Sequence, residues 1–453
     1  MGKGVAGILA VVLLIAIIFL ASVTLFYWLA GQITTQPVSN TPMPIVGNVL
    51  SASAGYIEVA IANLGSQPLP QGNSFVVAEN MAETVITQKI KPGEQRVFWF
   101  WGRYDKNDGY MGFDDRATIY DPEAGTSAPT LGIPAVETRE VTAYEVFSTE
   151  GFEPSMSVTE DNSGVLWLVF TSNESIGSHD IWIMNSTDNG GNWNNPYAIA
   201  VQGVMEQEDS PQIAYNGTYY VLYRSWYGDN NMTLTYSTSA EEGTWSTPEK
   251  SNIPVTDVDP NEYGYSPTNK RGFAFILDDN NLFWASYIDG TDVVVRNSTD
   301  ALGWNTEIVV NDSASPGKVS MMQDRNGKYW VAYVGADNTT IEVASSDDAN
   351  TWGQPAVVSD EDYSHACTGP ALMQDNHDSY FLFADNSGCT EIFVKASRDG
   401  VLWSRASWLP NATMSDRHPS VMQASDESYL MAFADADSIH VRTSSDPMIW
   451  VER

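Results

Sequence analysis

The chain begins with one long apolar run and continues as many short ones. Residues 5–30 contain no charged side chain, and that run exceeds the roughly 20 residues that an α-helix needs to cross a bilayer. From residue 46 onward the apolar runs are short, rich in β-branched and aromatic residues, and separated by Gly, Pro, Asn, Ser and Asp. Such runs predict β-strands joined by turns. The pattern therefore predicts an all-β protein preceded by one transmembrane helix within residues 1–32.

The flanks of the apolar run predict its orientation. A cleaved signal peptide has a shorter apolar stretch and a small-residue cleavage site, whereas this run continues through bulky residues to Tyr27 and Trp28, a pair that suits the membrane interface. Lys3 is the sole charge before the run. We therefore expect a cytoplasmic N-terminus, with everything after Gln32 outside, at the cell surface.

Two regions follow the helix. Residues 33–45 are rich in Thr, Pro, Gln and Asn and are interpreted as a linker. Residues 46–138 contain strand-like runs separated by turn sequences, which predicts a small antiparallel β-sandwich. Within it, Phe98–Trp101 alternates between the two faces of a strand and is expected to supply core and a packing surface. The sequence Asp105–Gly109 departs from the spacing of a calcium loop, so a turn is expected there.

A repeat organises residues 141–453. Six times a proline is followed by an aromatic-rich strand, a second strand, a Ser/Asp turn and a tryptophan. The tryptophans lie 47 to 59 residues apart, close to the size of a four-stranded propeller blade. The fold class predicted is thus a six-bladed β-propeller plus a small β-sandwich, with one N-terminal helix. The prolines are Pro154, Pro211, Pro267, Pro316, Pro370 and Pro419.

The turn before each tryptophan resembles the Asp box of bacterial-neuraminidase-type repeats, S-x-D-x-G-x-x-W. The resemblance implies a sialidase-like propeller, in which the boxes are structural: Ser and Asp bond the backbone of the turn and Trp seals it. The second copy, ending at Trp245, has lost the Asp. The others are expected at Ser186, Asp188, Gly190 and Trp193; Ser298, Asp300 and Trp304; Ser345, Asp347 and Trp352, with Ala349 in the glycine place; Ser397, Asp399 and Trp403; and Ser444, Asp446 and Trp450.

The first thirty residues resemble the N-terminus of archaeal type IV pilin-like proteins. In these a short basic leader precedes a long apolar helix, which implies cleavage between Gly4 and Val5 and packing of the helix into a homo-oligomeric filament. The sequence "VAIANLGSQPLP" resembles the outer domains of archaeal pilins and archaellins. The alternative is an uncleaved membrane anchor.

Charge, cysteines and sequons modify this picture. Residues 141–453 carry 14 basic and 45 acidic side chains, a surface that repels nucleic acid and anionic headgroups; it is either a solubility adaptation or a face that collects cations. Cys367 and Cys389 flank one strand and are either a disulfide or two buried thiols. No cofactor or metal motif is present. Eight sequons predict N-glycosylation, at Asn173, Asn185, Asn216, Asn231, Asn297, Asn311, Asn338 and Asn411.

The resemblance to sialidases also makes an active site testable. Those enzymes are similar in using three arginines, an Asp acid and a Tyr–Glu pair, the first arginine lying two residues before the first proline. Here Phe152 and Glu153 precede Pro154, and Glu153 would repel a carboxylate. The residues expected at the channel mouth, by the proline register, are Glu153, Asp209, Arg271, His365, Arg417 and His418.

Three functions remain open. The first is a non-catalytic surface or pilin-like protein whose propeller binds glycans or another cell surface in adhesion. The second is a membrane-anchored exo-glycosidase of the sialidase type, and the third a structural surface or filament subunit. Fold alone does not decide activity. Because arginines are missing from the register in which sialidases carry them, the first function is favoured over the second.

Overall fold

A computed structural model describes most of the chain from residue 45 onward. It describes residues 45–53, 56–64, 74–78, 82–85, 90–101, 103–105, 109–111, 116–121, 126–127, 131–132, 141–148, 154–172, 179–200, 208–225, 231–254, 272–315, 318–337, 340–358, 369–385, 391–404, 406–409, 417–434, 438–448 and 450. The predicted N-terminal helix and the Gly4–Val5 cleavage site lie outside these residues. Within them no helix is long and apolar enough to span a membrane.

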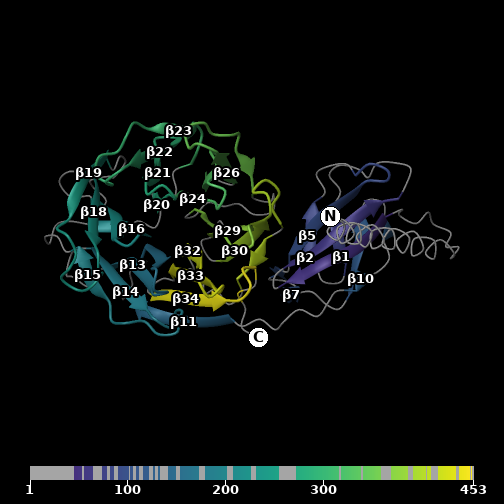
Figure 1. Cartoon of the computed structure of the whole chain (residues 1–453), viewed down its shortest axis with the longest axis horizontal. Helices are drawn as coiled ribbons and strands as arrows, with labels where there is room; N and C mark the ends of the chain where they lie inside the picture. The colour runs from purple at the N-terminus through teal and green to yellow at the C-terminus, as the bar shows by residue number, and fades with distance from the viewer. Residues whose placement is uncertain are drawn as a thin grey trace, which may run out of the picture.

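Six four-stranded antiparallel sheets form a closed ring, as the repeats predict (Figure 1). Blade 1 contains β12 (Met156–Glu160), β13 (Leu166–Ser172), β14 (Asp180–Ser186) and β15 (Tyr197–Ala200); blade 2, β16 (Glu208–Tyr215), β17 (Tyr219–Ser225), β18 (Asn231–Ser237) and β19 (Glu249–Pro254); blade 3, β20 (Ala274–Leu277), β21 (Phe283–Asp289), β22 (Asp292–Ser298) and β23 (Ile308–Asn311). Blade 4 contains β24 (Ser320–Gln323), β25 (Tyr329–Val334), β26 (Ile341–Ser346) and β27 (Ala356–Val357); blade 5, β28 (Ala371–Gln374), β29 (Tyr380–Asp385), β30 (Ile392–Ser397) and β31 (Ser407–Trp408). The first strand of each blade is innermost, since these strands contact one another around the ring.

The sixth blade closes the ring with a strand from the other end of the propeller. Its inner three strands are β32 (Arg417–Gln423), β33 (Tyr429–Ala434) and β34 (Ser438–Ser444), and its outer strand is β11 (Val141–Ser148). β11 pairs antiparallel with β34, from Val141 opposite Ser444 to Ser148 opposite Ser438. The ring is therefore held shut by hydrogen bonds between its first and last strands.

The hydrophobic core is divided into six clusters, one between each pair of adjacent blades. The tryptophan that follows the turn of the later blade belongs to each cluster or packs against it; between blades 5 and 6, for example, Trp450 packs on Phe383 with ring centroids 5.9 Å apart. A single blade cannot bury both of its faces, so the ring is the smallest unit with a continuous core. The six tryptophans are Trp193, Trp245, Trp304, Trp352, Trp403 and Trp450.

The Asp boxes stabilise the turn between the third and fourth strands, as expected. In blade 5 the Ser397 hydroxyl accepts from the Gly400 amide at 2.9 Å, and Asp399 accepts from the Val401 and Leu402 amides at 2.8 Å. The Trp403 indole donates to the Gly400 carbonyl at 3.3 Å. The polar side chains thus satisfy backbone groups that the turn leaves unpaired.

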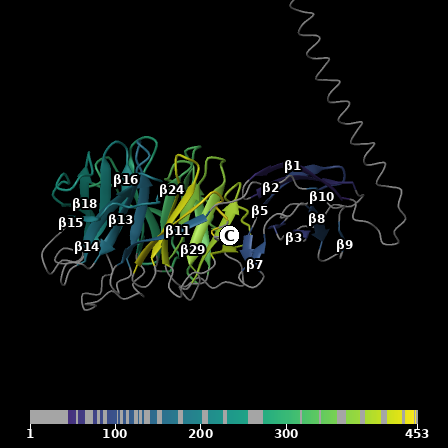
Figure 2. The same cartoon turned by 90° about the horizontal axis from the view of Figure 1, so that it is seen from below.

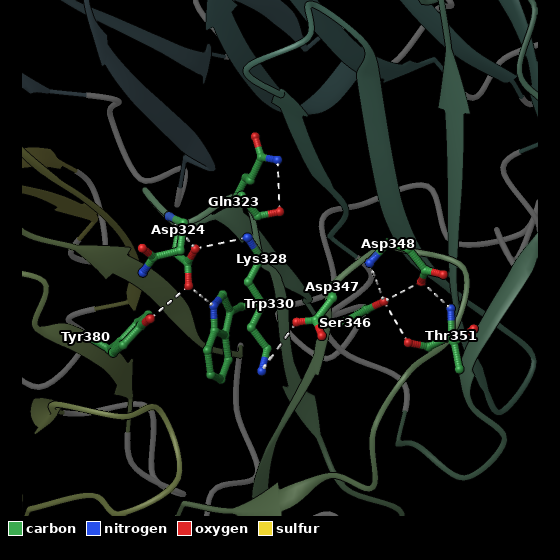
Figure 3. Close-up of polar contacts among 11 residues, drawn as sticks. Gln323, Asp324, Lys328, Trp330, Ser346, Asp347, Asp348, Thr351 and Tyr380 are labelled. Atoms are coloured by element: carbon green, nitrogen blue, oxygen red, sulfur yellow. Dashed lines mark hydrogen bonds and ion pairs between the residues drawn. The ribbon is translucent and has the colours of Figure 1, made fainter.

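The box of blade 4 lies one residue later than predicted. Ser346 donates to Asp348 at 3.0 Å, and Asp348 accepts from the Thr351 amide at 2.8 Å (Figure 3). Asp347 is 93% exposed and faces Lys328 instead. The sequence has two serines followed by two aspartates, so both registers fit the pattern. The structure selects the one in which Ser346 ends its strand, as in the other five blades.

A second repeated device links neighbouring blades at the same end of the ring. In the turn after β24, Asp324 accepts from the Trp330 indole of its own blade and from the Tyr380 hydroxyl of blade 5, both at 2.8 Å (Figure 3). Three equivalent tyrosine–aspartate hydrogen bonds join blades 1 and 2, 3 and 4, and 5 and 6: Tyr219 to Asp161, Tyr329 to Asp278 and Tyr429 to Asp375.

Residues 45–132 form a separate group of antiparallel sheets (Figures 1 and 2). One contains β1 (Ile45–Ser53), β2 (Tyr56–Asn63) and β5 (Gln95–Trp101); the other contains β3 (Ser74–Ala78), β4 (Ala82–Val85), β8 (Arg116–Asp121), β9 (Thr126–Ser127) and β10 (Leu131–Gly132). β6 (Arg103–Asp105) and β7 (Gly109–Met111) form a hairpin across the segment where a turn was expected. Strand β1 begins at Ile45, within the end of the predicted linker.

Strand β5 attaches this module to the propeller. Trp101 is 5% exposed and belongs to the core cluster between blades 5 and 6, where its ring meets Phe381 edge-on at 5.5 Å. The guanidinium of Arg398 lies 5.6 Å from the centroid of the Trp99 ring. The aromatic run of β5 is therefore the packing surface that its alternation predicts.

Candidate functional site at the propeller mouth

The two ends of the ring differ in the connections that they carry. The turns after the inner strands and the Asp boxes lie at one end, since both follow strands that run in the same direction. We call the opposite end, where the inner strands begin, the mouth. Two inner strands extend further toward the mouth than the others: β16 begins three residues before Pro211 and β32 two residues before Pro419, whereas β12 and β28 begin after Pro154 and Pro370.

The two extended strands share an irregularity and lie on either side of blade 1. The pairing register shifts between Asp209 and Gln212 in β16 and between Arg417 and Ser420 in β32. Both strands contact β12. Bulges of this kind often lie beside active sites and re-aim side chains. The mouth is therefore asymmetric, with its extended strands flanking blade 1.

An ion pair lies on the blade 2 side of the mouth. Arg224 at the end of β17 holds Asp209 with two hydrogen bonds, Nε to Oδ1 at 2.5 Å and Nη2 to Oδ2 at 2.6 Å. The side chains are 12% and 8% exposed. In the described part of the chain, Arg224 Nη1 has no hydrogen-bond partner, so the guanidinium keeps donors for a further group. Arg224 was not predicted as a site residue, because its pairing with Asp209 depends on the register of two strands.

Further ionisable groups surround this pair. Glu208 is fully buried and its amide donates to the His179 carbonyl at 3.1 Å, while Asp180 is 1% exposed. Burial lowers the pKa of His179 below its ordinary value, although the Asp209 carboxylate raises it. His179 is therefore neutral near pH 7, and the surroundings of the ion pair are predominantly acidic.

A half-buried lysine occupies the other side of the mouth. Lys318, just before β24, packs so closely on blades 3 and 5 that a Cβ at Gly272 would come within 2.6 Å of its Cγ, and one at Gly369 within 2.8 Å of its Cβ. Burial lowers the pKa of Lys318 to about 8, and the Asp385 carboxylate opposes the shift. Lys318 was also missed in the sequence, because its environment comes from three blades.

The structure places few of the predicted mouth residues. Asp209 is at the mouth, as expected. Arg417 and His418 lie in the extended part of β32, but only their backbone is described. Glu153, Arg271, His365 and the two cysteines, Cys367 and Cys389, lie outside the described residues.

Most of the propeller arginines whose side chains are described lie away from the mouth. Arg296 on β22 pairs with Glu307, which directly precedes β23, and Arg442 is on β34. Arg325 and Arg398 lie in turns at the opposite end. Among these side chains only Arg224 is at the mouth, and it is paired with Asp209. The described residues therefore assemble no three-arginine site.

The described residues place neither a metal site nor most of the sequons at the mouth. No group of three or more His, Cys, Asp or Glu in the described residues could hold a metal ion. Asn216 is exposed in a turn at the opposite end, whereas the amide of Asn311 donates to Tyr333 at 2.7 Å. Asn173, Asn338 and Asn411 lie outside the described residues.

Known proteins resemble this chain in structure only. No protein-family model and no curated protein matches the sequence. A variant of the NanB sialidase from Streptococcus pneumoniae superposes with a TM-score of 0.52 at 9% identity, over 88% of this chain and 97% of that one. A protein of unknown function from Dyadobacter fermentans DSM 18053 has a TM-score of 0.51 at 13% identity, over 67% and 98%. At such identities the likeness shows the fold alone: this chain contains a six-bladed propeller of the architecture that a sialidase has.

Proposed function

We propose that this chain is a cell-surface protein whose propeller binds carbohydrate at the mouth, beside blade 1, without hydrolysing sialic acid. The apolar run of residues 5–30 would anchor it, either as a membrane helix or as a pilin-type helix. The observation that carries the proposal is the ion pair between Asp209 on the extended strand β16 and Arg224 on β17.

The position of this pair favours a role in ligand recognition over a role in stabilising the fold. A buried ion pair contributes little net stability, because desolvation offsets the attraction between its charges. Here the pair lies at the mouth, and one guanidinium nitrogen remains available to donate. A paired guanidinium and carboxylate present fixed donors and acceptors, which suit sugar hydroxyls, while the acidic surroundings oppose an anionic sugar.

Glycan binding tests the proposal. The full-length chain in detergent would be applied to an array of neutral, sulfated and sialylated glycans. We expect retention of neutral glycans and at least a tenfold loss with Arg224→Lys, which keeps the charge but not the planar fork. Arg398→Lys at the opposite end is the matched control and should bind as the wild type does. Failure of the wild type to retain any glycan would refute the proposal.

The alternative is an exo-glycosidase of the sialidase type. It is favoured by the fold and by Arg417 in the register of the sialidase arginine. Turnover of a fluorogenic sialoside by the wild type, abolished in Arg417→Ala, would establish it. N-terminal sequencing separates the two anchors, since a start at Val5 indicates pilin-type processing and an intact Met1 a plain membrane helix.

A further inference from the structure

One residue at the mouth has a backbone conformation that its side chain disfavours. Ser210, in the bulge of β16, has a φ of 52°, in the left-handed region that L-residues other than glycine rarely adopt. The seven other non-glycine residues of the described chain with positive φ lie in tight turns at the opposite end: Asn189, Ala240, Asn281, Ala301, Ala349, Asp378 and Glu427. Ser210 is the one of the eight that lies within a strand.

The surroundings fix this conformation from both sides. Asp209 is bound by Arg224, and Pro211 is buried. The Ser210 amide donates to the Ser155 hydroxyl of blade 1 at 2.9 Å, and that hydroxyl is 3.0 Å from Thr171 Oγ1. Conformations of this kind persist only when neighbouring groups impose them, and they concentrate at functional sites.

A glycine at position 210 would adopt this positive φ without strain. In blade 5 the residue before the equivalent proline, Pro370, is Gly369, with a φ of 111°. Blade 2 instead has a serine, whose Cβ makes a positive φ unfavourable. Ser210 is only partly buried, and within the described structure its hydroxyl has no hydrogen-bond partner. The Ser210 hydroxyl therefore contributes no hydrogen bond to the fold, although keeping a side chain at this position strains the backbone.

We propose that Ser210 is a ligand-recognition residue, whose hydroxyl bonds a hydroxyl of a neutral saccharide held beside the Asp209–Arg224 pair. This inference rests on the proposed function and specifies its ligand class. A serine hydroxyl both donates and accepts, as a sugar hydroxyl does. The paired charges of Asp209 and Arg224 cancel, and Asp180 and Glu208 nearby disfavour a carboxylate or sulfate.

The experiment separates strain from recognition. Ser210→Gly removes the strain and the hydroxyl, whereas Ser210→Ala removes the hydroxyl alone. Glu427→Gly, at an exposed positive-φ position in the turn between β32 and β33, is the matched control, because it relieves strain at the opposite end without removing a buried side chain. The probe is the neutral glycan that the wild type retains most strongly on the array, and stability is measured by urea unfolding of the full-length chain in detergent.

We expect Ser210→Gly to unfold at higher urea than the wild type and to bind the probe at least tenfold more weakly. Ser210→Ala should lose the same affinity without the gain in stability, and Glu427→Gly should gain stability with unchanged affinity. Wild-type affinity in both Ser210 variants would overturn the inference, as would an unchanged urea midpoint in Ser210→Gly or a preference of the wild type for sialylated glycans. If the wild type binds no glycan, the proposed function itself has failed.

Discussion

Tyr380 of blade 5 donates its hydroxyl hydrogen bond to Asp324 of blade 4 at 2.8 Å, and Asp324 is 3% exposed. Hydrogen bonds to a charged group contribute about 1.5–3 kcal/mol. We therefore expect Tyr380→Phe to lower the free energy of unfolding by about that amount, measured by urea denaturation at pH 7. Tyr236→Phe, at a tyrosine that is 38% exposed, should change it by less than about 0.5 kcal/mol. Equal effects would contradict an inter-blade role for the bond.

The same aspartate makes stability depend on pH. Burial raises the pKa of Asp324, but hydrogen bonds from Trp330, Tyr380 and the backbone outweigh it, so the pKa lies below its ordinary value of 3.8. The unfolded chain then binds protons first as the pH falls, so this stability is present above about pH 4 and is lost below it. In urea titrations at pH 7 and pH 3, Tyr380→Phe should lose less stability than the wild type. Equal losses would argue against this linkage.

Two Asp boxes predict opposite effects of exchanging glycine and alanine. Ala349 has a φ of 53°, and Gly400 holds the equivalent place in blade 5 with a φ of 69°. A Cβ at Gly400 would meet the Trp330 ring of blade 4. Ala349 is 0% exposed, so Ala349→Gly relieves about 1–2 kcal/mol of strain but loses about 0.8 kcal/mol of methyl burial, and we expect it to stabilise by no more than about 1 kcal/mol. Gly400→Ala should destabilise by about 1–3 kcal/mol; urea unfolding measures both. A stabilising Gly400→Ala would disprove the steric argument.

The attachment of the N-terminal module depends on one tryptophan. Trp101→Ala should destabilise the contact between β5 and blade 5 by about 3–5 kcal/mol, the usual effect of removing a buried aromatic side chain. Differential scanning calorimetry should then resolve separate transitions for the module and the propeller. Trp99→Ala, which removes the half-buried ring that Arg398 contacts, is the control and should change the profile much less than Trp101→Ala does. Identical profiles for all three proteins would contradict this role of Trp101.

Lys318 predicts that the free energy of unfolding also depends on pH in the alkaline range. Its pKa is lowered from 10.5 to about 8, so between these values the unfolded chain binds more protons than the folded one. The stability of the wild type relative to Lys318→Met should therefore rise as the pH increases from 8 to 10.5, and stay constant below pH 8. Urea unfolding across this range measures it. A flat difference would mean that the amine is solvated in the folded chain.

The blades could be predicted because their markers are local. Every box but the second places Ser, Asp and Trp within a few residues, so the repeat is visible in the sequence, and only the doubled Ser345–Ser346 allows a wrong register. The tyrosine–aspartate links were missed although a signal exists: Asp161, Asp278 and Asp324 each precede a tryptophan by six residues. Their tyrosine partners belong to the next blade, about fifty residues away, where no local pattern connects them.

The mouth could be predicted only in part. The proline register located Asp209 correctly, since the register follows from the repeat. Arg224 becomes visible only through the pairing of β16 with β17, and Lys318 only through the approach of three blades. The strain at Ser210 has no counterpart in composition or periodicity. These features depart from the repeat, so the repeat cannot predict them.

The pairing of β11 with β34 also sets the order in which the protein can be made. Translation delivers β11 first among the strands of the ring and β34 last, so the sixth sheet stays incomplete until β34 has been synthesised. Closing so long a loop is entropically unfavourable and slow. Until it closes, the row of blades already made leaves an apolar face uncovered at its end. A nascent chain that stops before residue 438 has no partner for β11. The ring therefore closes only after synthesis has passed Ser444, because no shorter product can complete it.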